Sequence, residues 1–228
     1  MPNVFQKLLG HKRRNIENNG LFQKYEYLNA EGNFDYEAYK EAQIKANKRK
    51  IDKVWATQEN ISTLADYVLD LTPSPSFGLC HGTRRGLEQK WFAQCLGCKV
   101  LGTEISDTAK DFENTLQWDM NEAKPEWIGA CDFIYSNSLD HSYDPERCLR
   151  TWMECLKPHG VCFIEHSPDD IDAKESDPFG AHISVLPYLI LHWGKGQFFV
   201  TEIIDLPQSA RISEKRDIPV KALVVRNA

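Results

Sequence analysis

The sequence contains no long hydrophobic run. Its most apolar stretch, residues 183–193, is short and contains Pro187, whereas about 20 consecutive apolar residues are needed to cross a bilayer. Residues 1–4 do not introduce the apolar core of a secretory signal peptide. We therefore expect a cytoplasmic protein without a membrane partner, in which the seven cysteines are reduced thiols.

The sequence also lacks an excess of positive charge. Lysine and arginine number 27 against 33 aspartates and glutamates, which gives a net charge of -6 and a pI near 5.7. Nucleic-acid binding depends on basic side chains that neutralise phosphates, so we expect no nucleic-acid partner. Two local basic clusters, residues 11–14 and 45–53, are explained by a solvated face. A mobile lid or a docking surface for an anionic substrate is the alternative.

Metal-binding patterns are scarce as well. Cys95 and Cys98 form a Cys-x-x-Cys pair, but a zinc site needs a second pair of ligands at similar spacing, and none follows. Cys95 instead completes an apolar helical pattern with Leu87 and Trp91, and Gly97 suits the helix end. We expect both thiols to be packing residues and predict no metal site.

Residues 1–72 differ in composition from the rest of the chain, because they are highly charged. Residues 34–55 predict a helix with only a ragged apolar face. Residues 61–69 predict a second helix with a clean apolar stripe, and Asn60 is placed to cap it. Two prolines then break the pattern. We expect a helical extension over residues 1–72 that packs on or caps a core domain over residues 73–228.

Four short apolar strands follow, and each ends in small, acidic or polar residues. They are predicted at residues 77–81, 99–104, 115–118 and 131–135, with helix-like segments between them. Strands that alternate with helices form a parallel sheet, and such sheets bind ligands outside the carboxyl ends of their strands. This succession predicts a site for a nucleoside cofactor.

The second half of the chain continues the alternation. An Asp-Pro start predicts a helix over residues 144–156. A buried strand is predicted at residues 161–164, and a further helix at residues 180–193. The last two strands, at residues 197–204 and 218–225, predict a hairpin at one edge of the sheet.

The order of these elements resembles the class I S-adenosylmethionine-dependent methyltransferases over roughly residues 76–225. The resemblance implies an α/β fold with a doubly wound, seven-stranded, Rossmann-like sheet that is parallel except for its antiparallel last strand. It also implies S-adenosyl-L-methionine as the cofactor and methyl transfer as the activity. The terminal hairpin fits this fold and does not fit an ordinary dinucleotide-binding domain.

The resemblance assigns roles to residues at the strand ends. Gly82 matches the central glycine of the loop that passes beneath the methionine part of the cofactor. Glu104 matches the acid that binds both ribose hydroxyls, and Asp119 matches the acid that takes the adenine amino group. The expected cofactor-binding residues are Cys80, His81, Gly82, Glu104, Ile105, Asp119, Met120, Asn137 and Ser138.

The glycine loop departs from the family pattern, which usually starts with an acid and carries three glycines at alternate positions. Here those places hold Gly78, Cys80, Gly82 and Arg84. The depleted loop keeps open a methyltransferase-like binding module that has lost catalysis. A nicotinamide-dependent oxidoreductase is a further alternative, but it would require a Gly-x-Gly-x-x-Gly loop. Capping or turn roles remain alternatives for the acidic and polar residues that follow the strands.

Methyl transfer to an oxygen atom also requires a base, because the acceptor must lose a proton. The expected catalytic residues are His141 and Asp140 after the fourth strand and His166 after the fifth, with structural roles as the alternative. A metal-assisted variant would use Asp140, Glu165 and Asp169 as oxygen ligands.

The sequence does not identify the acceptor. We expect a small molecule, with a sugar or saccharide intermediate as the first expectation, because the chain resembles methyltransferases encoded with surface-polysaccharide enzymes. Arg84 and Arg85 follow Gly82 and could grip an anionic acceptor. No Asn/Asp-Pro-Pro-Tyr/Trp sequence follows the fourth strand, which argues further against nucleic acid as the substrate.

Overall fold

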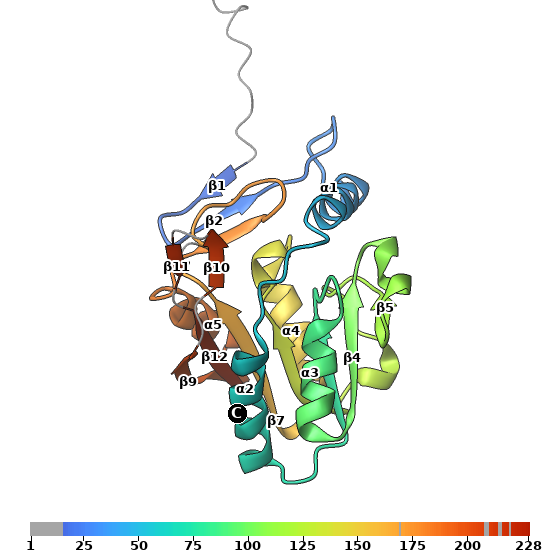
Figure 1. Ribbon diagram of the computed structural model, residues 1–228. Coiled ribbons are helices and arrows are strands. Elements are labelled where there is room, and N and C mark those ends of the chain that lie inside the picture. The colour runs from blue at the N-terminus through green and yellow to red at the C-terminus, as the bar shows by residue number, and fades with distance from the viewer. Residues whose placement is uncertain (1–15, 169, 208–209, 214–215, 219) are drawn as a thin grey trace, which may run out of the picture.

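The computed structural model describes residues 16–228 apart from residues 169, 208–209, 214–215 and 219. Its centre is a seven-stranded sheet (Figure 1). In spatial order the strands are β5 (Thr115–Gln117), β4 (Lys99–Glu104), β3 (Phe77–His81), β6 (Cys131–Ser136), β7 (Leu156–His166), β12 (Lys221–Asn227) and β9 (Phe198–Asp205). Neighbours from β5 to β7 pair in parallel, and β12 is antiparallel to both β7 and β9. The predicted fold is confirmed, including the antiparallel last strand.

Helices cover both faces of this sheet. The core helices are α2 (Gln58–Leu71) and α3 (Leu87–Leu96) on one face, and α4 (Pro145–Cys155) and α5 (Leu186–Gly194) on the other. Successive strand residues point to opposite faces, as β6 illustrates. Phe133 and Tyr135 belong to the core beneath α2 and α3, whereas Ile134 belongs to the core beneath α4 and α5. Burial on both sides explains why the central strands are apolar throughout.

A smaller layer lies above the carboxyl ends of the parallel strands (Figure 1). It contains α1 (Tyr36–Arg49) and a three-stranded antiparallel sheet of β1 (Ile16–Asn18), β2 (Phe22–Tyr25) and β8 (Phe179–Ala181). Pairing of β2 with β8 joins segments that lie more than 150 residues apart in the chain. The predicted division at residue 72 stays a prediction.

The first two helices differ from their predicted bounds. α1 ends at Arg49, so the predicted helix over residues 34–55 was too long. α2 begins three residues before its predicted stripe, because the side chain of Thr57 accepts a hydrogen bond from the backbone N–H of Asn60. Asn60 therefore lies inside the first turn and is not the cap.

The segment at residues 180–193 was wrongly predicted as one helix. Its first residues form β8, because the backbone there pairs with β2. Gly180 permits this, since a Cβ would come within 2.5 Å of the Ile171 carbonyl oxygen. The helix α5 begins only at Leu186, with Pro187 in its first turn, where a missing N–H costs nothing.

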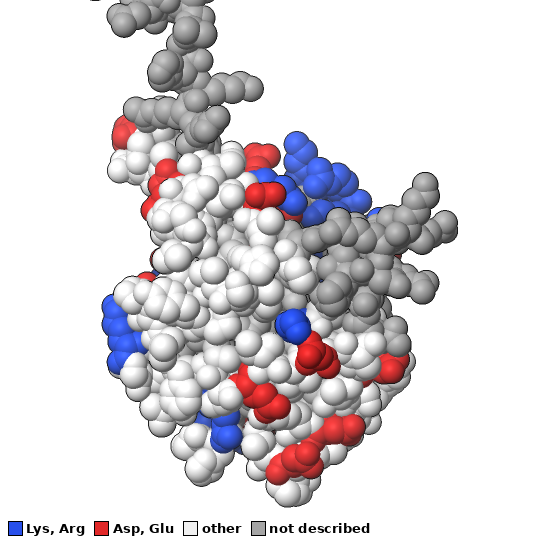
Figure 2. All heavy atoms as spheres, turned by 90° about the vertical axis from the view of Figure 1, so that its left-hand side faces the viewer, with Lys and Arg blue, Asp and Glu red and all other residues white. Residues whose placement is uncertain are grey.

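Three further predictions concern the surface. The basic cluster at residues 11–14 lies outside the described residues. Over the lower half of the face drawn in Figure 2, basic side chains stand singly among acidic ones, so this part of the face offers no basic surface to a polyanion.

All seven cysteines are free, but Cys95 is exposed, so the prediction that it packs was wrong. None of the described helices is long and apolar enough to span a membrane.

Candidate functional site

The loops after β3 and β6 lie against each other at the carboxyl edge of the sheet. Gly82 has a φ of 72°, in the left-handed region, and a Cβ there would come within 2.6 Å of the Cβ and Oγ of Ser138. The Gly82 N–H donates to the carbonyl of Thr103 on β4 at 2.9 Å. Only glycine satisfies this conformation and this close approach together.

Glu104 ends β4 and is 7% exposed. Its Oε1 accepts a hydrogen bond from the backbone N–H of Ser106 at 3.0 Å. Burial raises the pKa of the Glu104 carboxyl, although the Ser106 N–H and the charges of Arg84 and His141 oppose the shift. The predicted strand thus ends at Glu104 and places a carboxyl group there, and its role toward a cofactor stays a prediction.

Asp119 follows β5 and is held by three hydrogen bonds. Its Oδ1 accepts from the backbone and side-chain nitrogens of Asn121 at 2.9 and 2.7 Å, and its Oδ2 accepts from the hydroxyl of Tyr36 at 3.0 Å. Tyr36 comes from α1. The adjacent Met120 is 7% exposed, and its carbonyl accepts from the Trp152 indole at 2.8 Å.

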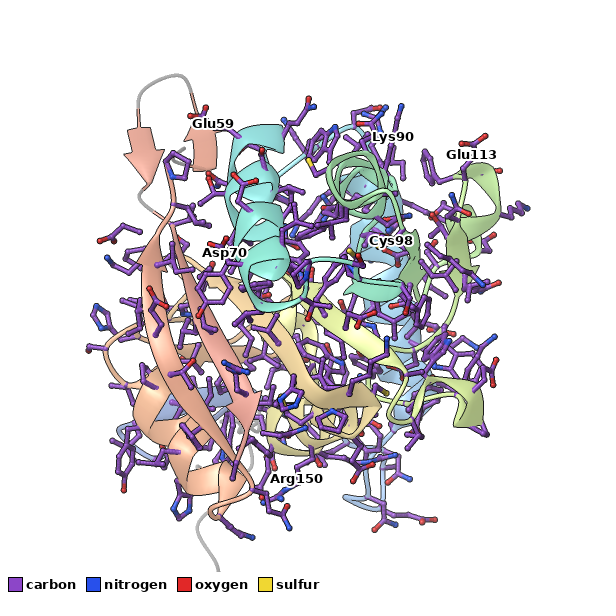
Figure 3. All side chains as sticks on the ribbon, turned by 90° about the horizontal axis from the view of Figure 1, so that it is seen from below. Glu59, Asp70, Lys90, Cys98, Glu113 and Arg150 are labelled. Atoms are coloured by element: carbon purple, nitrogen blue, oxygen red, sulfur yellow. The ribbon has the colours of Figure 1, made fainter. Side chains whose placement is uncertain are left out.

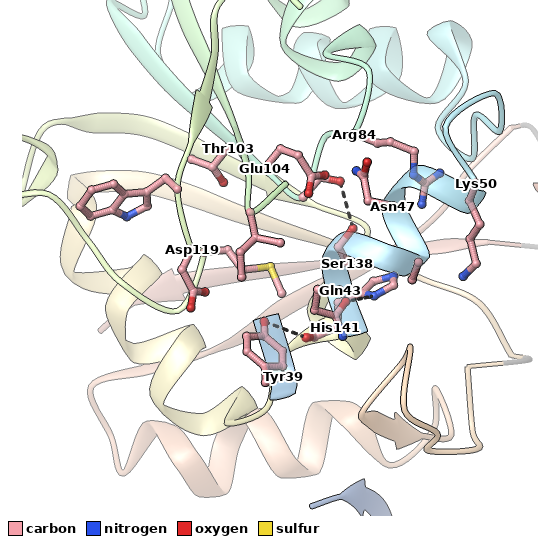
Figure 4. Close-up of a pocket in the computed structure, with 15 residues that line it drawn as sticks. Tyr39, Gln43, Asn47, Lys50, Arg84, Thr103, Glu104, Asp119, Ser138 and His141 are labelled. Atoms are coloured by element: carbon pink, nitrogen blue, oxygen red, sulfur yellow. Dashed lines mark hydrogen bonds between the residues drawn. The ribbon is translucent and has the colours of Figure 1, made fainter. Parts of the chain in front are cut away.

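These strand ends line a cleft whose empty space, counted out to open solvent, is about 530 Å³ (Figure 4). Of the predicted cofactor-binding residues, the cleft is lined by Gly82, Glu104, Ile105, Asp119, Met120 and Ser138. Asn137 lines two adjoining cavities instead.

Two of the predicted residues do not line a described cavity. Cys80 is fully buried in the core beneath α2 and α3. His81 is 2% exposed, stacks on Trp152 at a centroid distance of 5.0 Å, and bonds through Nδ1 to the hydroxyl of Thr103 at 2.9 Å. Burial lowers the pKa of His81 to about 3. Both side chains are therefore packed into the body of the sheet.

The roof of the cleft comes from α1, which sequence reasoning did not assign to the site. Tyr39, Gln43, Asn47 and Lys50 line it (Figure 4). The hydroxyl of Tyr39 donates to the carbonyl of His141 at 3.2 Å. These residues recur at helical spacing on a helix whose apolar face is ragged, and this polar stripe is the signal that could have revealed the roof.

A second cavity, of about 990 Å³, opens beside the cleft, over the ends of β6 and β7. The predicted catalytic residues Asp140, His141 and His166 all line it, together with Glu165. Asp177, from the loop before β8, completes an acidic wall. The sequence predicted the residues at the strand ends but not this loop.

His141 stands where the cavities meet, since it lines the cleft, the second cavity and a smaller one between them. Its Nδ1 lies 3.0 Å from Oε1 of Gln43. An amide oxygen only accepts, so Nδ1 carries the proton and Nε2 the lone pair. Nε2 lies 3.9 Å from Oδ2 of Asp140. Burial raises the pKa of Asp140 to about 6, while His141 opposes the shift.

His166 and Glu165 line the floor of the second cavity. His166 Nε2 lies 2.8 Å from the Ala181 carbonyl and must donate to it, which leaves the lone pair on Nδ1. Burial lowers the pKa of His166, so the neutral form is favoured. Glu165 accepts from the buried hydroxyl of Tyr135 at 2.9 Å, and burial raises the pKa of Glu165 to about 7.

Among the residues that the structure describes, one group of side chains could hold a metal ion. The ligand atoms of Asp140, His141 and Asp177 lie within 4.8 Å of one another. Asp177 is already compensated by Lys174 at 2.5 Å and Lys50 at 3.6 Å, which favours an ion-paired acid over a metal ligand. The predicted ligand Asp169 lies outside the described residues.

Known proteins share both the domain and the fold. Residues 79–164 match the family profile described as a methyltransferase domain. A solved 1,6-didemethyltoxoflavin-N1-methyltransferase from Burkholderia thailandensis, with S-adenosylhomocysteine bound, is 13% identical and aligns with a TM-score of 0.65 over 93% of this chain and 99% of its own. No curated protein matches the chain in sequence.

Two further solved structures are similar. The plantazolicin methyltransferase BpumL, in complex with S-adenosylhomocysteine, is 15% identical, with a TM-score of 0.61 over 84% of this chain and 96% of its own. The [4+2]-cyclase SpnF is 16% identical, with a TM-score of 0.54 over 72% of this chain and 80% of its own. Residues 79–164 thus match a methyltransferase domain, and the chain shares the fold of solved methyltransferases with S-adenosylhomocysteine bound, in agreement with the resemblance.

Proposed function

We propose that the protein transfers a methyl group from S-adenosylmethionine in the cleft to a hydroxyl of a small molecule in the second cavity. The observation that carries the proposal is the place of His141, which lines both spaces. A base at this junction faces the donor on one side and the acceptor on the other. This placement is what an in-line displacement with loss of a proton requires.

The residues of the cleft fit the cofactor. Gly82 leaves a backbone surface that a Cβ would fill, and Glu104 and Asp119 present carboxylates at two neighbouring strand ends. In this proposal Glu104 binds the ribose hydroxyls, Asp119 takes the adenine amino group, and Met120 contacts the ring. When bound, the cofactor supplies a methyl group already activated on a sulfonium.

The protein's own residues handle the proton. With the cofactor held by Glu104, Asp119 and Met120, transfer would form a bond between the acceptor oxygen and the methyl carbon, break the carbon–sulfur bond and release a thioether. The hydroxyl proton passes to Nε2 of His141, whose Nδ1–H is held by Gln43. Asp140, at 3.9 Å from the same nitrogen, stabilises the imidazolium that forms. His166, with its lone pair on Nδ1, is the second candidate base.

The lining of the second cavity supports a polyhydroxylated acceptor, a sugar or saccharide intermediate. Asp140, Glu165 and Asp177 offer acceptors for hydroxyl groups, Asn137 offers an amide, and Trp55 adds a flat apolar surface. Such a combination of hydrogen-bonding groups and one aromatic ring suits a ligand with many hydroxyls and apolar C–H faces.

A transfer assay tests the proposal. Purified protein, labelled S-adenosylmethionine and a panel of sugars, sugar phosphates, phenols and amines are combined, and label is followed into product. We expect transfer to a hydroxylated member and its loss in His141→Ala. Binding of S-adenosylhomocysteine without transfer to any acceptor would favour the binding-module alternative, and binding of NAD in its place would favour the oxidoreductase.

A further inference from the structure

Arg84 occupies a backbone conformation that favours glycine. Its φ is 39°, in the left-handed region, and it is one of only three residues other than glycine with positive φ in the described chain. The place is one at which related methyltransferase loops usually carry glycine. A side chain kept at such a position indicates that the side chain itself has a use.

The guanidinium of Arg84 is half-buried and short of partners. Nη1 donates to the carbonyl of Lys53 at 3.1 Å, whereas Nε is buried without a hydrogen-bond partner. Within the part of the chain that the structure describes, no carboxylate forms an ion pair with it at 4.0 Å or less. Buried charges are normally paired directly, whereas the carboxylates that act on Arg84, Glu104 and Glu88 first among them, do so without a direct ion pair.

A second ionisable side chain, that of Glu88, also has a buried polar atom without a hydrogen-bond partner. Arg84 and Glu88 both line the cavity of about 370 Å³ that adjoins the cleft at Gly82. Oε2 of Glu88 is buried without a hydrogen-bond partner. Burial raises the pKa of Glu88 to about 8, while the charge of Arg84 opposes the shift. The small cavity therefore offers a ligand a guanidinium and a carboxyl group that each have a buried atom without a hydrogen-bond partner.

The order of residues along the cleft indicates which ligand group meets them. In Figure 4, Asp119 lies at one end of the cleft, Glu104 in the middle and Arg84 at the other end. A cofactor with its adenine at Asp119 and its ribose at Glu104 extends its remaining part toward Arg84. In S-adenosylmethionine that part ends in an α-carboxylate and an α-ammonium group.

We propose that Arg84 binds the cofactor's α-carboxylate and that Glu88 pairs with its α-ammonium group. This assignment rests on the proposed function. Arg84 would then select cofactors with an intact amino-acid end. A glycine at this position would offer only its backbone. An anionic acceptor is the competing occupant, and the experiment separates the two.

Calorimetry with two ligands tests the role of Arg84. S-adenosylhomocysteine carries both charged groups, and decarboxylated S-adenosylhomocysteine lacks only the carboxylate. We expect wild-type protein to bind the first about 10- to 100-fold more tightly than the second, the scale for a hydrogen-bonded charged group. Arg84→Gly should remove this preference and should also raise the melting temperature, because glycine relieves the left-handed backbone.

The control variant also loses one positive charge, but at a residue outside the site. Lys90→Met removes one positive charge from the outer side of α3, where Lys90 points into solvent (Figure 3), and should leave the preference intact. In Glu88→Gln, the wild-type preference for S-adenosylhomocysteine over its deaminated analogue should disappear.

The outcomes separate two failures. If S-adenosylhomocysteine binds the wild type but Arg84→Gly keeps the preference for the carboxylate, the assignment of Arg84 is wrong and the proposed function stands. The assignment is equally wrong if the variant binds both ligands as the wild type does and only the KM of the methyl acceptor rises. If neither ligand binds the wild type, the proposed function itself fails.

Discussion

The cleft proposed for the cofactor and the cavity proposed for the acceptor lie side by side, yet they are built differently. Of the predicted acids of the cleft, Glu104 ends β4 and Asp119 closely follows β5, and parallel pairing fixes the register of both strands. The acceptor cavity takes part of its wall from residues 170–177, in a loop held by few regular hydrogen bonds. Rigid strand ends suit a constant cofactor, whereas a loop can be rebuilt for each acceptor. The two halves should therefore respond differently to mutation.

The largest expected effect is on turnover and not on the cofactor. His141→Ala should lower kcat by about 10²- to 10⁴-fold, because general-base assistance is worth that much, with far less change in S-adenosylhomocysteine affinity. Steady-state kinetics and calorimetry on the same protein measure both. His159→Ala, an exposed histidine at the start of β7, is the control. Equal losses in turnover and affinity would show that His141 serves the cofactor half.

The reverse pattern is expected for the end of β4. Glu104→Ala should weaken S-adenosylhomocysteine binding by about 1.5–3 kcal/mol, the range for hydrogen bonds to charged groups. The KM for the acceptor should change little. Titration calorimetry measures the affinity. The control is Glu113→Ala, which removes an acid from the exposed surface (Figure 3). Unchanged cofactor affinity would remove the ribose assignment.

A third prediction concerns the contact between the two loops. Gly82→Ala should lower the free energy of unfolding by about 1–3 kcal/mol more than Gly97→Ala. Both glycines have positive φ, but a Cβ at Gly97 meets nothing within 4 Å, whereas one at Gly82 meets Ser138. Urea denaturation measures the difference. Equal losses of unfolding free energy in the two variants would show that the loop after β6 can move to accommodate the Cβ. The cleft would then be less rigid than its strands suggest.

The smallest expected effect is the pH dependence of stability in the acceptor half. The pKa of Glu165 is about 7 in the folded protein and near 4.5 when unfolded. The folded state therefore holds a proton that the unfolded state releases. Stability should be full below about pH 4.5 and should fall as pH rises through 7.

The variant Glu165→Gln replaces the carboxyl oxygen that accepts from the Tyr135 hydroxyl with an amide oxygen, which can accept the same hydrogen bond but does not titrate. The free energy of unfolding of the variant minus that of the wild type should be about 1–2 kcal/mol larger at pH 8 than at pH 5. Melting temperatures of both proteins across this range give the comparison. Parallel curves for the two proteins would show that Glu165 does not titrate near neutral pH.

How far the sequence predicted the site follows from the same comparison. Glu104 at the end of one predicted strand and Asp119 just after the next predicted the cleft, because parallel pairing brings successive strand ends to one edge of the sheet. The sequence pattern did not show that the last residues of β3 are still buried in the core. Cys80 and His81 were therefore assigned to the cofactor, although both side chains are buried. Exposure at a strand's last residues depends on neighbouring layers that the sequence does not place.

The roof and the acceptor wall were missed for a different reason. Gln43 and Asn47 lie on α1, about 60 residues before Glu104, and only the fold brings them over the cleft. Asp177 reaches the second cavity from a loop without periodicity. Periodic patterns report an element's own faces, not the distant element that it covers. The cytoplasmic location, the absence of a nucleic-acid partner and the acceptor stay predictions.

A crystal structure with S-adenosylhomocysteine tests the central claim most directly. We predict ribose hydroxyls bonded to Glu104, adenine beside Asp119 and Met120, and a sulfur atom that faces His141 and the acceptor cavity. A ligand bound elsewhere, or a sulfur atom turned away from that cavity, would contradict this prediction.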